Sequence, residues 1–527
     1  MTQLYRSFKK YHKWLGVFLA IFFVFFALSG IVLNHRGFFS SVDVGRGWLP
    51  ADYHYSNWNN ASIRGSVQIE NDSILVYGNI GVWLTNRNYS EFIDFNKGFE
   101  KGIDNRKISD LHKTQTNQLF ASTLFGLFKF SENKWQKVQL PVKEERMVAI
   151  TERGDSLIVM SRSHILYSLG KENYSEFNVL PLKTPIGAEN SVSLFKTIWV
   201  IHSGEILGSI GKIIVDFGGV ALILLSVTGL IYFFAPKLLR KIQLSLKLRR
   251  NIKRTNRWSF KWHLKVGIIA ALLLFIVSIT GIFLRPPLLI PIANKVVKPI
   301  KGSYLDNPNY WHDRLRDIIY DSRINAFVIS TSEGFFSVNE NFEIPPQRFS
   351  IQPPVSVMGI NAFDIDENGN YIVGSFSGLY SWNLSNRFLS DYITGLPIVA
   401  TSGLQSPFGS MPIAGQISFS DGSKEFFDYN IGAIGFSKTH RLPQMPNEII
   451  EKSGISLWNL ALEFHTWRIA KFLIGDFYIL IVPIAGLLCI VIIFTGSVMW
   501  FIRQRRKKYN LITEVDSDNE IKIGNVG

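Results

Sequence analysis

Residues 12–35 read HKWLGVFLAIFFVFFALSGIVLNH, and this stretch decides the fold class of a chain of 527 residues. From Trp14 to His35 it holds no Asp, Glu, Lys or Arg, and about 20 apolar residues suffice for a helix to cross a bilayer. It is too long for the apolar core of a signal peptide and lacks a small-residue cleavage site, so we expect a retained helix. Three further stretches are equally free of charge: Phe217–Pro236, Val266–Leu284 and Phe477–Ile502.

The net charge of +15 indicates how the chain crosses the membrane. Residues 1–13, 237–261 and 503–527 hold 20 Lys and Arg against 4 acids, so these pieces carry +16 and the rest of the chain −1. The positive-inside rule then places both termini and the 237–261 loop in the cytoplasm, and two large segments outside. Because the basic excess lies at the membrane flanks, it argues against nucleic-acid binding.

Cysteine usage excludes several kinds of site. The chain has one cysteine, Cys489, so a disulfide scaffold, a cysteine-based zinc site and a covalently attached c-type haem are ruled out.

The two halves of the chain repeat one unit. His12-Lys-Trp-Leu-Gly16 aligns with His263-Leu-Lys-Val-Gly267, and 18 residues after each His stands the Gly of Ser29-Gly30 or Thr280-Gly281. The second and fourth apolar stretches also align. Each contains a Thr-Gly pair and follows a histidine, and these residues are His202 with Thr228-Gly229 and His465 with Thr495-Gly496. We therefore predict a bundle of four transmembrane helices, duplicated as two plus two about an axis along the membrane normal.

The predicted order of segments is as follows. A cytoplasmic stub and first helix span 1–35, an outer β segment 36–200, a His-bearing outer segment and second helix 201–236, and a basic cytoplasmic loop 237–261. The third helix spans 262–285, the second outer β segment 286–462, the second His-bearing segment and fourth helix 463–502, and the cytoplasmic tail 503–527.

The outer segments have the pattern of β-strands. Apolar runs alternate with Gly, Asn and Ser, and a repeat of strand, small turn, Gly and aromatic or aliphatic pair recurs. The glycines Gly81 and Gly126 are 45 residues apart, and Gly334, Gly378 and Gly422 are spaced by 44. This period suits one four-stranded blade, so three blades from each segment would close one shared β-propeller. Two separate β-rich domains are the alternative.

Four of the ten histidines occupy duplicated positions beside the membrane: His12, His202, His263 and His465. A twofold axis brings His12 to His263 at the inner side and His202 to His465 at the outer side. Imidazole pairs between apolar helices can hold a b-type haem near each surface. The alternative is that these are structural or interfacial histidines preserved by the duplication. His35 has no symmetric counterpart and is either an alternative outer haem ligand or a surface residue.

All four apolar stretches contain Ser-Gly or Thr-Gly. Glycine permits close approach of a ring or of a neighbouring backbone, and the hydroxyl can bond back to its own helix. Close helix packing is the expected role, and it is compatible with accommodating a haem.

The membrane regions resemble a known family. Residues 10–16 and 28–36 are similar to the first helix of the PepSY-associated transmembrane family, and 201–208 with Thr228-Gly229 are similar to its second conserved region. Characterised members include inner-membrane haem proteins that reduce ferric siderophores on the periplasmic side. The resemblance implies haem ligation by the four duplicated histidines. The chain departs from the family pattern in its outer segments, where propeller-like repeats replace the small α/β PepSY domain.

The leading hypothesis is an inner-membrane dihaem electron-transfer protein, an oxidoreductase that reduces a periplasmic ferric chelate and so releases iron. The sequence has no nucleotide-binding motif, so the donor is quinol or a separate reductase. Basic and aromatic residues at the outer rim are candidates for holding the chelate, although interfacial anchoring also explains them. They are Arg36, Trp199, Arg285, Trp467 and Arg468.

Two other classes of function stay open. One is a non-enzymatic, membrane-anchored β-propeller that binds or senses a partner in iron uptake. The other is a transporter of the chelate, which is weaker because the four stretches carry no Asp, Glu, Lys or Arg at mid-membrane. Two pairs lie at the outer edge, where we expect interfacial salt bridges: Lys212 with Asp216, and Lys471 with Asp476.

Overall fold

The computed structural model describes residues 2–70, 72–143, 146–170, 173–241, 245–354, 358–398, 409, 411–437 and 440–524. The chain divides into two compact units. A helical unit comprises Met1–Arg36, Ser191–Asp306 and Ala461–Gly527, and a β unit comprises Gly37–Asn190 and Asn307–Leu460.

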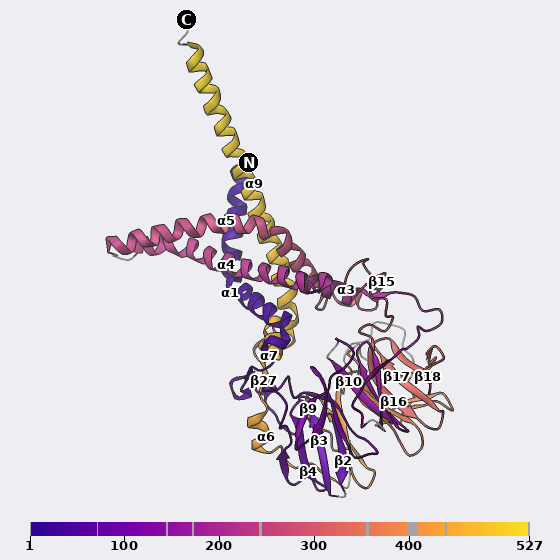
Figure 1. Ribbon diagram of the computed structural model, residues 1–527. Helices are drawn as coiled ribbons and strands as arrows, with labels where there is room; N and C mark the ends of the chain where they lie inside the picture. Colours follow the sequence, from indigo (N-terminus) through magenta and orange to yellow (C-terminus); the bar gives the residue numbers. More distant parts are fainter. Residues whose placement is uncertain are drawn as a thin grey trace. The chain divides into compact units, whose positions relative to one another are not determined.

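Four long helices build the helical unit (Figure 1). They are α1 (Thr2–Asn34), α4 (Gly208–Lys241), α5 (Leu246–Phe283) and α9 (Ile481–Gly524). Helices α1 and α5 each contact both α4 and α9, so the four form a closed bundle. All four are long and apolar enough to cross a membrane, over Gln3–Asn34, Glu205–Arg240, Leu246–Phe283 and Arg468–Arg506. The protein is therefore a membrane protein with an extramembrane β unit.

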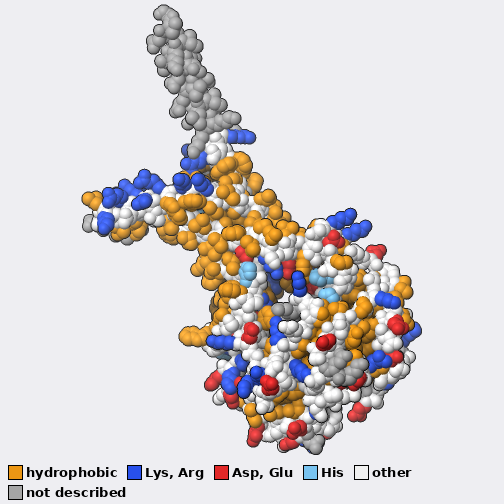
Figure 2. Space-filling view, viewed as in Figure 1, with side chains coloured by type: hydrophobic (Ala, Val, Ile, Leu, Met, Phe, Trp, Pro, Cys, Tyr) orange, Lys and Arg blue, Asp and Glu red, His pale blue; other side chains and the backbone are white. Residues whose placement is uncertain are grey.

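The helices extend beyond the charge-free stretches from which they were predicted. Helix α5 has 38 residues, or about 57 Å at 1.5 Å per residue, against a hydrocarbon core of about 30 Å. Its first half is basic, and Figure 2 shows Lys and Arg along the hairpin of α4 and α5, with apolar side chains over the body of the bundle. Charged residues continue a helix once it has left the lipid.

Two short helices carry the remaining duplicated histidines. Helix α3 (Leu194–Ser203) is capped at its N-terminus by Ser193, whose hydroxyl accepts from Lys196 N at 3.0 Å, and at its C-terminus by Gly204 with φ of 80°. Helix α7 (Leu457–His465) ends at its histidine. Short connecting elements complete the helical unit: β14 (Val192–Ser193) paired with β15 (Val296–Val297), η4 (Glu205–Leu207), η5 (Ile290–Ile292), η6 (Arg468–Ala470), α8 (Lys471–Ile474) and η7 (Gly475–Leu480).

Among the described residues, the β unit contains six antiparallel sheets of three or four strands, each made of strands consecutive in sequence. The first half of the chain forms β2–β5 (Gly65–Glu70, Ser73–Gly78, Gly81–Asn86, Phe92–Asp94), β6–β9 (Ile108–Lys113, Leu119–Thr123, Gly126–Ser131, Lys134–Lys137) and β10–β13 (Met147–Arg153, Ser156–Ser161, Ile165–Leu169, Asn178–Leu180). The second half forms β16–β19 (Leu315–Asp321, Ala326–Thr331, Gly334–Asn339, Gln347–Arg348), β20–β23 (Ile360–Ile365, Tyr371–Ser375, Gly378–Asn383, Phe388–Asp391) and β24–β26 (Ile413–Ser418, Lys424–Asp428, Gly432–Ala433).

Shorter elements complete the β unit. They are α2 (Arg36–Phe39), η1 (Arg46–Trp48), η2 (Ala51–Tyr53), α6 (Asn447–Lys452) and the pair of β1 (Asp43–Val44) with β27 (Ile455–Ser456).

The repeated glycines mark the same place in most sheets. Gly126, Gly334 and Gly378 open the third strand with φ of 145°, 126° and 147°, a region that favours glycine. Gly422 does not follow this pattern, because it lies in the turn between β24 and β25, and Gly432 opens the third strand of that sheet instead. Gly378 and Gly422 are 44 residues apart, but they therefore do not occupy equivalent positions in their sheets.

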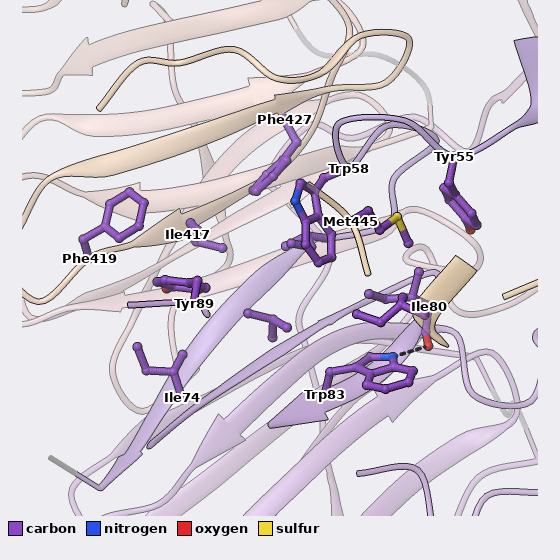
Figure 3. Close-up of a cluster of buried hydrophobic side chains, with 13 residues drawn as sticks. Tyr55, Trp58, Ile74, Ile80, Trp83, Tyr89, Ile417, Phe419, Phe427 and Met445 are labelled. Carbon is purple, nitrogen blue, oxygen red and sulfur yellow. Dashed lines mark hydrogen bonds between the residues drawn. The ribbon is translucent and has the colours of Figure 1, made fainter. Parts of the chain in front are cut away.

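The first strands of the six sheets contact one another in a ring. Strand β2 contacts β6, and the contacts continue through β10, β16, β20 and β24 back to β2. Buried apolar clusters fill the interfaces between neighbouring sheets. Figure 3 shows the cluster that joins the first sheet to the last, which contains Trp83 and Ile74 as well as Ile417 and Phe427. The indole of Trp83 is fully buried and donates to Ile80 O at 3.1 Å.

Candidate functional site

The four duplicated histidines form two facing pairs in the helical unit. His12 of α1 and His263 of α5 have ring centroids 6.1 Å apart and ring planes at 90°. His202 and His465, at the ends of α3 and α7, also have centroids 6.1 Å apart, with planes at 65°. The structure thus brings together the same pairs that the duplication predicted.

The same type of contact holds all four imidazole rings. The Nδ1 atom of each histidine lies within hydrogen-bond distance of the hydroxyl in a Ser-Gly or Thr-Gly pair on another helix. The Nδ1 to hydroxyl distances are 3.3 Å for His12 and Thr495, 3.2 Å for His202 and Thr280, 3.1 Å for His263 and Thr228, and 2.9 Å for His465 and Ser29. The Ser/Thr-Gly pairs therefore orient the histidines, a role beyond the close helix packing expected for them.

The glycine of each pair lies beside the same imidazole. A Cβ added at Gly496 or Gly281 would stand 2.9 Å from Cε1 of His12 or His202. The corresponding distances are 3.3 Å for Gly229 with His263 and 3.5 Å for Gly30 with His465. Glycine is needed at two of these positions for the ring to come so close.

Backbone carbonyls decide which ring nitrogen carries the proton. Nδ1 of His12 lies 3.0 Å from Ile492 O, and Nδ1 of His202 lies 3.0 Å from Val277 O. Because a carbonyl oxygen only accepts, Nδ1 is the donor in both rings, and Nε2 keeps its lone pair. This is the tautomer that metal-bound imidazole usually adopts.

The spacing of each pair is compatible with two imidazoles that would bind one iron together. A metal–imidazole bond of about 2.0–2.1 Å, with roughly 1.1 Å more from nitrogen to ring centre, places the two centroids about 6.3 Å apart. Both pairs have 6.1 Å. The imidazoles of each pair could therefore hold a haem through its iron.

The two pairs lie at opposite ends of the bundle. His465 contacts Gly30, and Gly30 lies 18 residues after His12 on α1. His202 contacts Gly281, which lies 18 residues after His263 on α5. At 1.5 Å per residue, the two sites are about 27 Å apart along the helices.

His35 does not join either pair. Its Nε2 lies 2.5 Å from Asp216 Oδ2, and Asn34 Nδ2 donates to Asp216 Oδ1 at 3.0 Å. The predicted salt bridge between Lys212 and Asp216 is wrong, because Lys212 Nζ contacts Glu205 Oε1 instead, at 3.0 Å. No sequence pattern predicts these partners, since each depends on how α1 and η4 pack against α4.

The rim residues proposed to hold a chelate have structural contacts. Arg468 Nε donates to Glu463 Oε2 at 2.6 Å, and a second guanidinium bond reaches Oε1. Trp467 packs on Phe22 of α1, with centroids 4.6 Å apart. Glu463 is buried and was missed by sequence reasoning, because it lies outside the charge-free stretches.

The other three rim residues lie in different settings. Arg285 Nη2 donates to Thr466 O at 3.2 Å. Trp199 is 46% exposed, and Lys196 Nζ lies 5.1 Å from its ring centroid. Arg36 begins the short helix α2. The structure gathers Arg285, Trp467 and Arg468 near His465, whereas Trp199 lies on α3.

Known structures resemble the chain only distantly. The extracellular domain of a hybrid two-component system of B. thetaiotaomicron is 9% identical with a TM-score of 0.34, over 70% of this chain and 32% of that one. PorZ, a surface component of the type-IX secretion system of Porphyromonas gingivalis, is 9% identical with a TM-score of 0.20, over 71% of this chain and 44% of that one. The chain thus spans less than half the length of either. No curated protein matches the chain in sequence.

A family model gives a more specific match. The model of the PepSY-associated TM region matches residues 2–235 and 194–308. These ranges cover more than half of the chain and include α1, α3, α4 and α5, with three of the four paired histidines. The chain therefore belongs to the PepSY-associated TM family.

Proposed function

We propose that this protein is a dihaem electron-transfer protein that carries electrons across the cytoplasmic membrane and reduces a ferric chelate on the outer side. The proposal rests on one arrangement that occurs four times. In each case a Ser or Thr hydroxyl and the Gly next to it hold an imidazole that faces a second imidazole. Two such pairs at 6.1 Å are hard to explain as helix packing alone.

The residues for each haem follow from the pairing. His12 and His263 would hold one b-type haem, and His202 and His465 the other. A b-type haem, when bound, supplies a reversible one-electron couple. The protein's own part is to hold each Nε2 toward the iron, with Nδ1 fixed by hydroxyl and carbonyl acceptors, and to keep water from the path between the sites.

The region between the two pairs is apolar and aromatic. From His465 a series of rings follows α1 toward His12. Phe26 lies 5.7 Å from the His465 ring, Trp467 lies 6.2 Å from Phe26, and Phe22 lies 4.6 Å from Trp467, measured between centroids. Such packing excludes water and ions, which favours electron transfer over transport of the chelate.

The internal duplication accounts for the symmetry of the proposed sites. Helices α1 and α5 carry the histidines of one pair and the Ser/Thr-Gly acceptors of the other. Helices α4 and α9 supply the remaining acceptors, and α3 and α7 the remaining histidines. A two-plus-two repeat about an axis along the bundle relates each element to its counterpart.

The β unit would form a six-bladed propeller outside the membrane. Six antiparallel sheets whose first strands contact each other in a ring support this arrangement. The basic ends of α1, α4, α5 and α9 support a cytoplasmic position for the His12–His263 end. In this orientation the His202–His465 end faces the periplasm of a Gram-negative cell.

The partners follow from the position of the two ends. Quinol or a separate reductase would deliver electrons to the His12–His263 end. A ferric chelate, with a siderophore as the favoured class, would receive them at the other end, and Fe(II) would leave because chelators of Fe(III) bind it more weakly. Residues at the outer rim, including Arg36 and Trp199, are candidates for contacting the chelate.

A reoxidation experiment tests this function. Purified protein loaded with haem is reduced without oxygen, and a ferric hydroxamate chelate is added together with a colorimetric Fe(II) trap. The haem α band should decay as trapped Fe(II) appears. His202→Ala should keep the inner haem but slow its oxidation by the chelate. Haem that stays reduced with the chelate, yet oxidises at once with oxygen, would refute the proposal.

A further inference from the structure

Arg285 lies directly after α5, next to the histidine at the end of α7. Its Nη2 donates to the carbonyl oxygen of Thr466, the residue after His465, at 3.2 Å. Arg285 is therefore a cation beside the outer histidine pair.

The Nε atom of Arg285 is buried and has no hydrogen-bond acceptor among the residues that the structure describes. Glu463 is the carboxylate whose charge acts on Arg285, but Arg468 already binds both of its oxygens. A buried guanidinium N–H without an acceptor is costly, and arginine is the side chain best suited to hold a carboxylate. The Nε–H of Arg285 is thus a donor that can bind an acceptor from outside the protein.

The other half of the chain shows that a positive charge is not needed to cap the helix. Asn34 occupies the position that corresponds to Arg285 in the duplication, and its Nδ2 donates to Ser203 O, the residue after His202, at 3.3 Å. Its second contact, Asp216 Oδ1, lies within the protein. A neutral amide is enough to bind the carbonyl, so the charge and the unused N–H of Arg285 require another reason.

We propose that Arg285 binds a carboxylate at the His202–His465 pair, and that this carboxylate is a propionate of the haem held there. The inference rests on the proposed function. A haem b carries two propionate carboxylates at one edge, and Arg285 lies at the end of the bundle, where that edge would face the surface. A carboxylate of the chelate is the other source of the same chemistry. The burial of Nε favours the resident group over an exchanging substrate.

A charge in this position has a consequence for the direction of electron flow. A nearby cation favours the reduced form of the haem, which carries one positive charge less. Arg285 would raise the reduction potential of the outer haem and so favour transfer toward the outer side.

A redox titration of the full-length protein in detergent tests the proposal. The variants are Arg285→Gln, Arg285→Lys and, as a control, Lys471→Gln, which removes an exposed positive charge at the start of α8. Arg285→Gln should lower the midpoint potential of one haem and leave the other unchanged. Arg285→Lys should restore most of the potential, and Lys471→Gln should shift neither. Two unshifted potentials in Arg285→Gln, with both haems retained, would overturn the proposal.

Two further measurements, haem refilling and the KM for two kinds of chelate, distinguish the remaining outcomes. If Arg285→Gln loses one haem, wild-type protein stripped of haem is refilled with haem dimethyl ester, which lacks propionate charge. The ester should then fill one site poorly, and equal filling of both sites would overturn the inference. Unshifted potentials with a raised KM for a carboxylate chelate, but not for a hydroxamate chelate, would assign the carboxylate to substrate and also overturn it. Wild-type protein without haem would instead refute the proposed function.

Discussion

Alanine substitutions at Gly281 and Gly30 test whether the glycines hold the imidazoles in place. Both glycines face the same histidine pair, Gly281 beside His202 and Gly30 beside His465. An added Cβ would lie 2.9 Å from Cε1 of His202 in the first case and 3.5 Å from Cε1 of His465 in the second. Carbon atoms are best placed about 3.5–4.0 Å apart, so the first ring must move by roughly 0.6 Å and the second need not move.

The expected free-energy changes have opposite signs for Gly30→Ala and Gly281→Ala. In a helix interior, alanine is more stable than glycine by about 0.5–1 kcal/mol, so Gly30→Ala should be neutral or stabilising. Overpacking costs about 1–3 kcal/mol, so Gly281→Ala should lose more than the helix gains. If that cost falls on the position of the imidazole, haem binding at this site should weaken by about 5- to 150-fold, since 1.36 kcal/mol is tenfold.

The assay is haem content per chain together with thermal unfolding in detergent. We expect Gly30→Ala to keep two haems and to unfold at the wild-type temperature or above, and Gly281→Ala to lose one haem. Gly496→Ala, with the same 2.9 Å distance to His12, should lose the other haem. Equal haem content in Gly281→Ala and Gly30→Ala would refute the reasoning.

Three other substitutions have expected outcomes. Thr280→Val removes the hydroxyl 3.2 Å from His202 Nδ1 and should weaken haem binding by up to about 10- to 100-fold, measured by haem titration of stripped protein; unchanged affinity would contradict the orienting role. Burial and then the charge of Asp110 raise the pKa of Asp317 well above its usual value, so the contribution of Asp317 to stability is fully present below its unfolded-state pKa and is lost as pH rises through its folded-state pKa. Asp317→Asn cannot ionise, so its unfolding free energy should exceed that of wild type by more at pH 8 than at pH 5, and a pH-independent difference would contradict this. Trp382→Ala removes a fully buried ring and should destabilise the β unit by about 3–5 kcal/mol in urea without changing the haem spectrum.

The sequence was sufficient to predict the histidine pairs, because each histidine occupies the same position in both copies of the repeated unit. His12 and His263 share a position in the repeat, so a twofold arrangement requires them to face each other. Their acceptors were harder to predict. Thr495 binds His12 from a helix more than 480 residues away, and the Thr-Gly motif also has a simpler explanation in helix packing.

Other features could not be predicted because they depend on tertiary packing. Asp216 receives both Asn34 and His35, but no local pattern joins α1 to α4. The charge-free stretches gave the number of spans, whereas the helices continue into basic segments that lie outside the lipid. In the β unit the spacing of 44 or 45 residues identified the repeat in four sheets and failed at Gly422, where the turn before β25 takes a glycine of its own.

The most direct test of the central claim is a reduced-minus-oxidised visible spectrum of the protein purified from haem-replete cells. The two histidine pairs predict a sharp b-type α band and two haems per chain. His12→Ala and His202→Ala should each remove about one haem and leave the other. A colourless wild-type protein, or full haem content in both variants, would contradict the account.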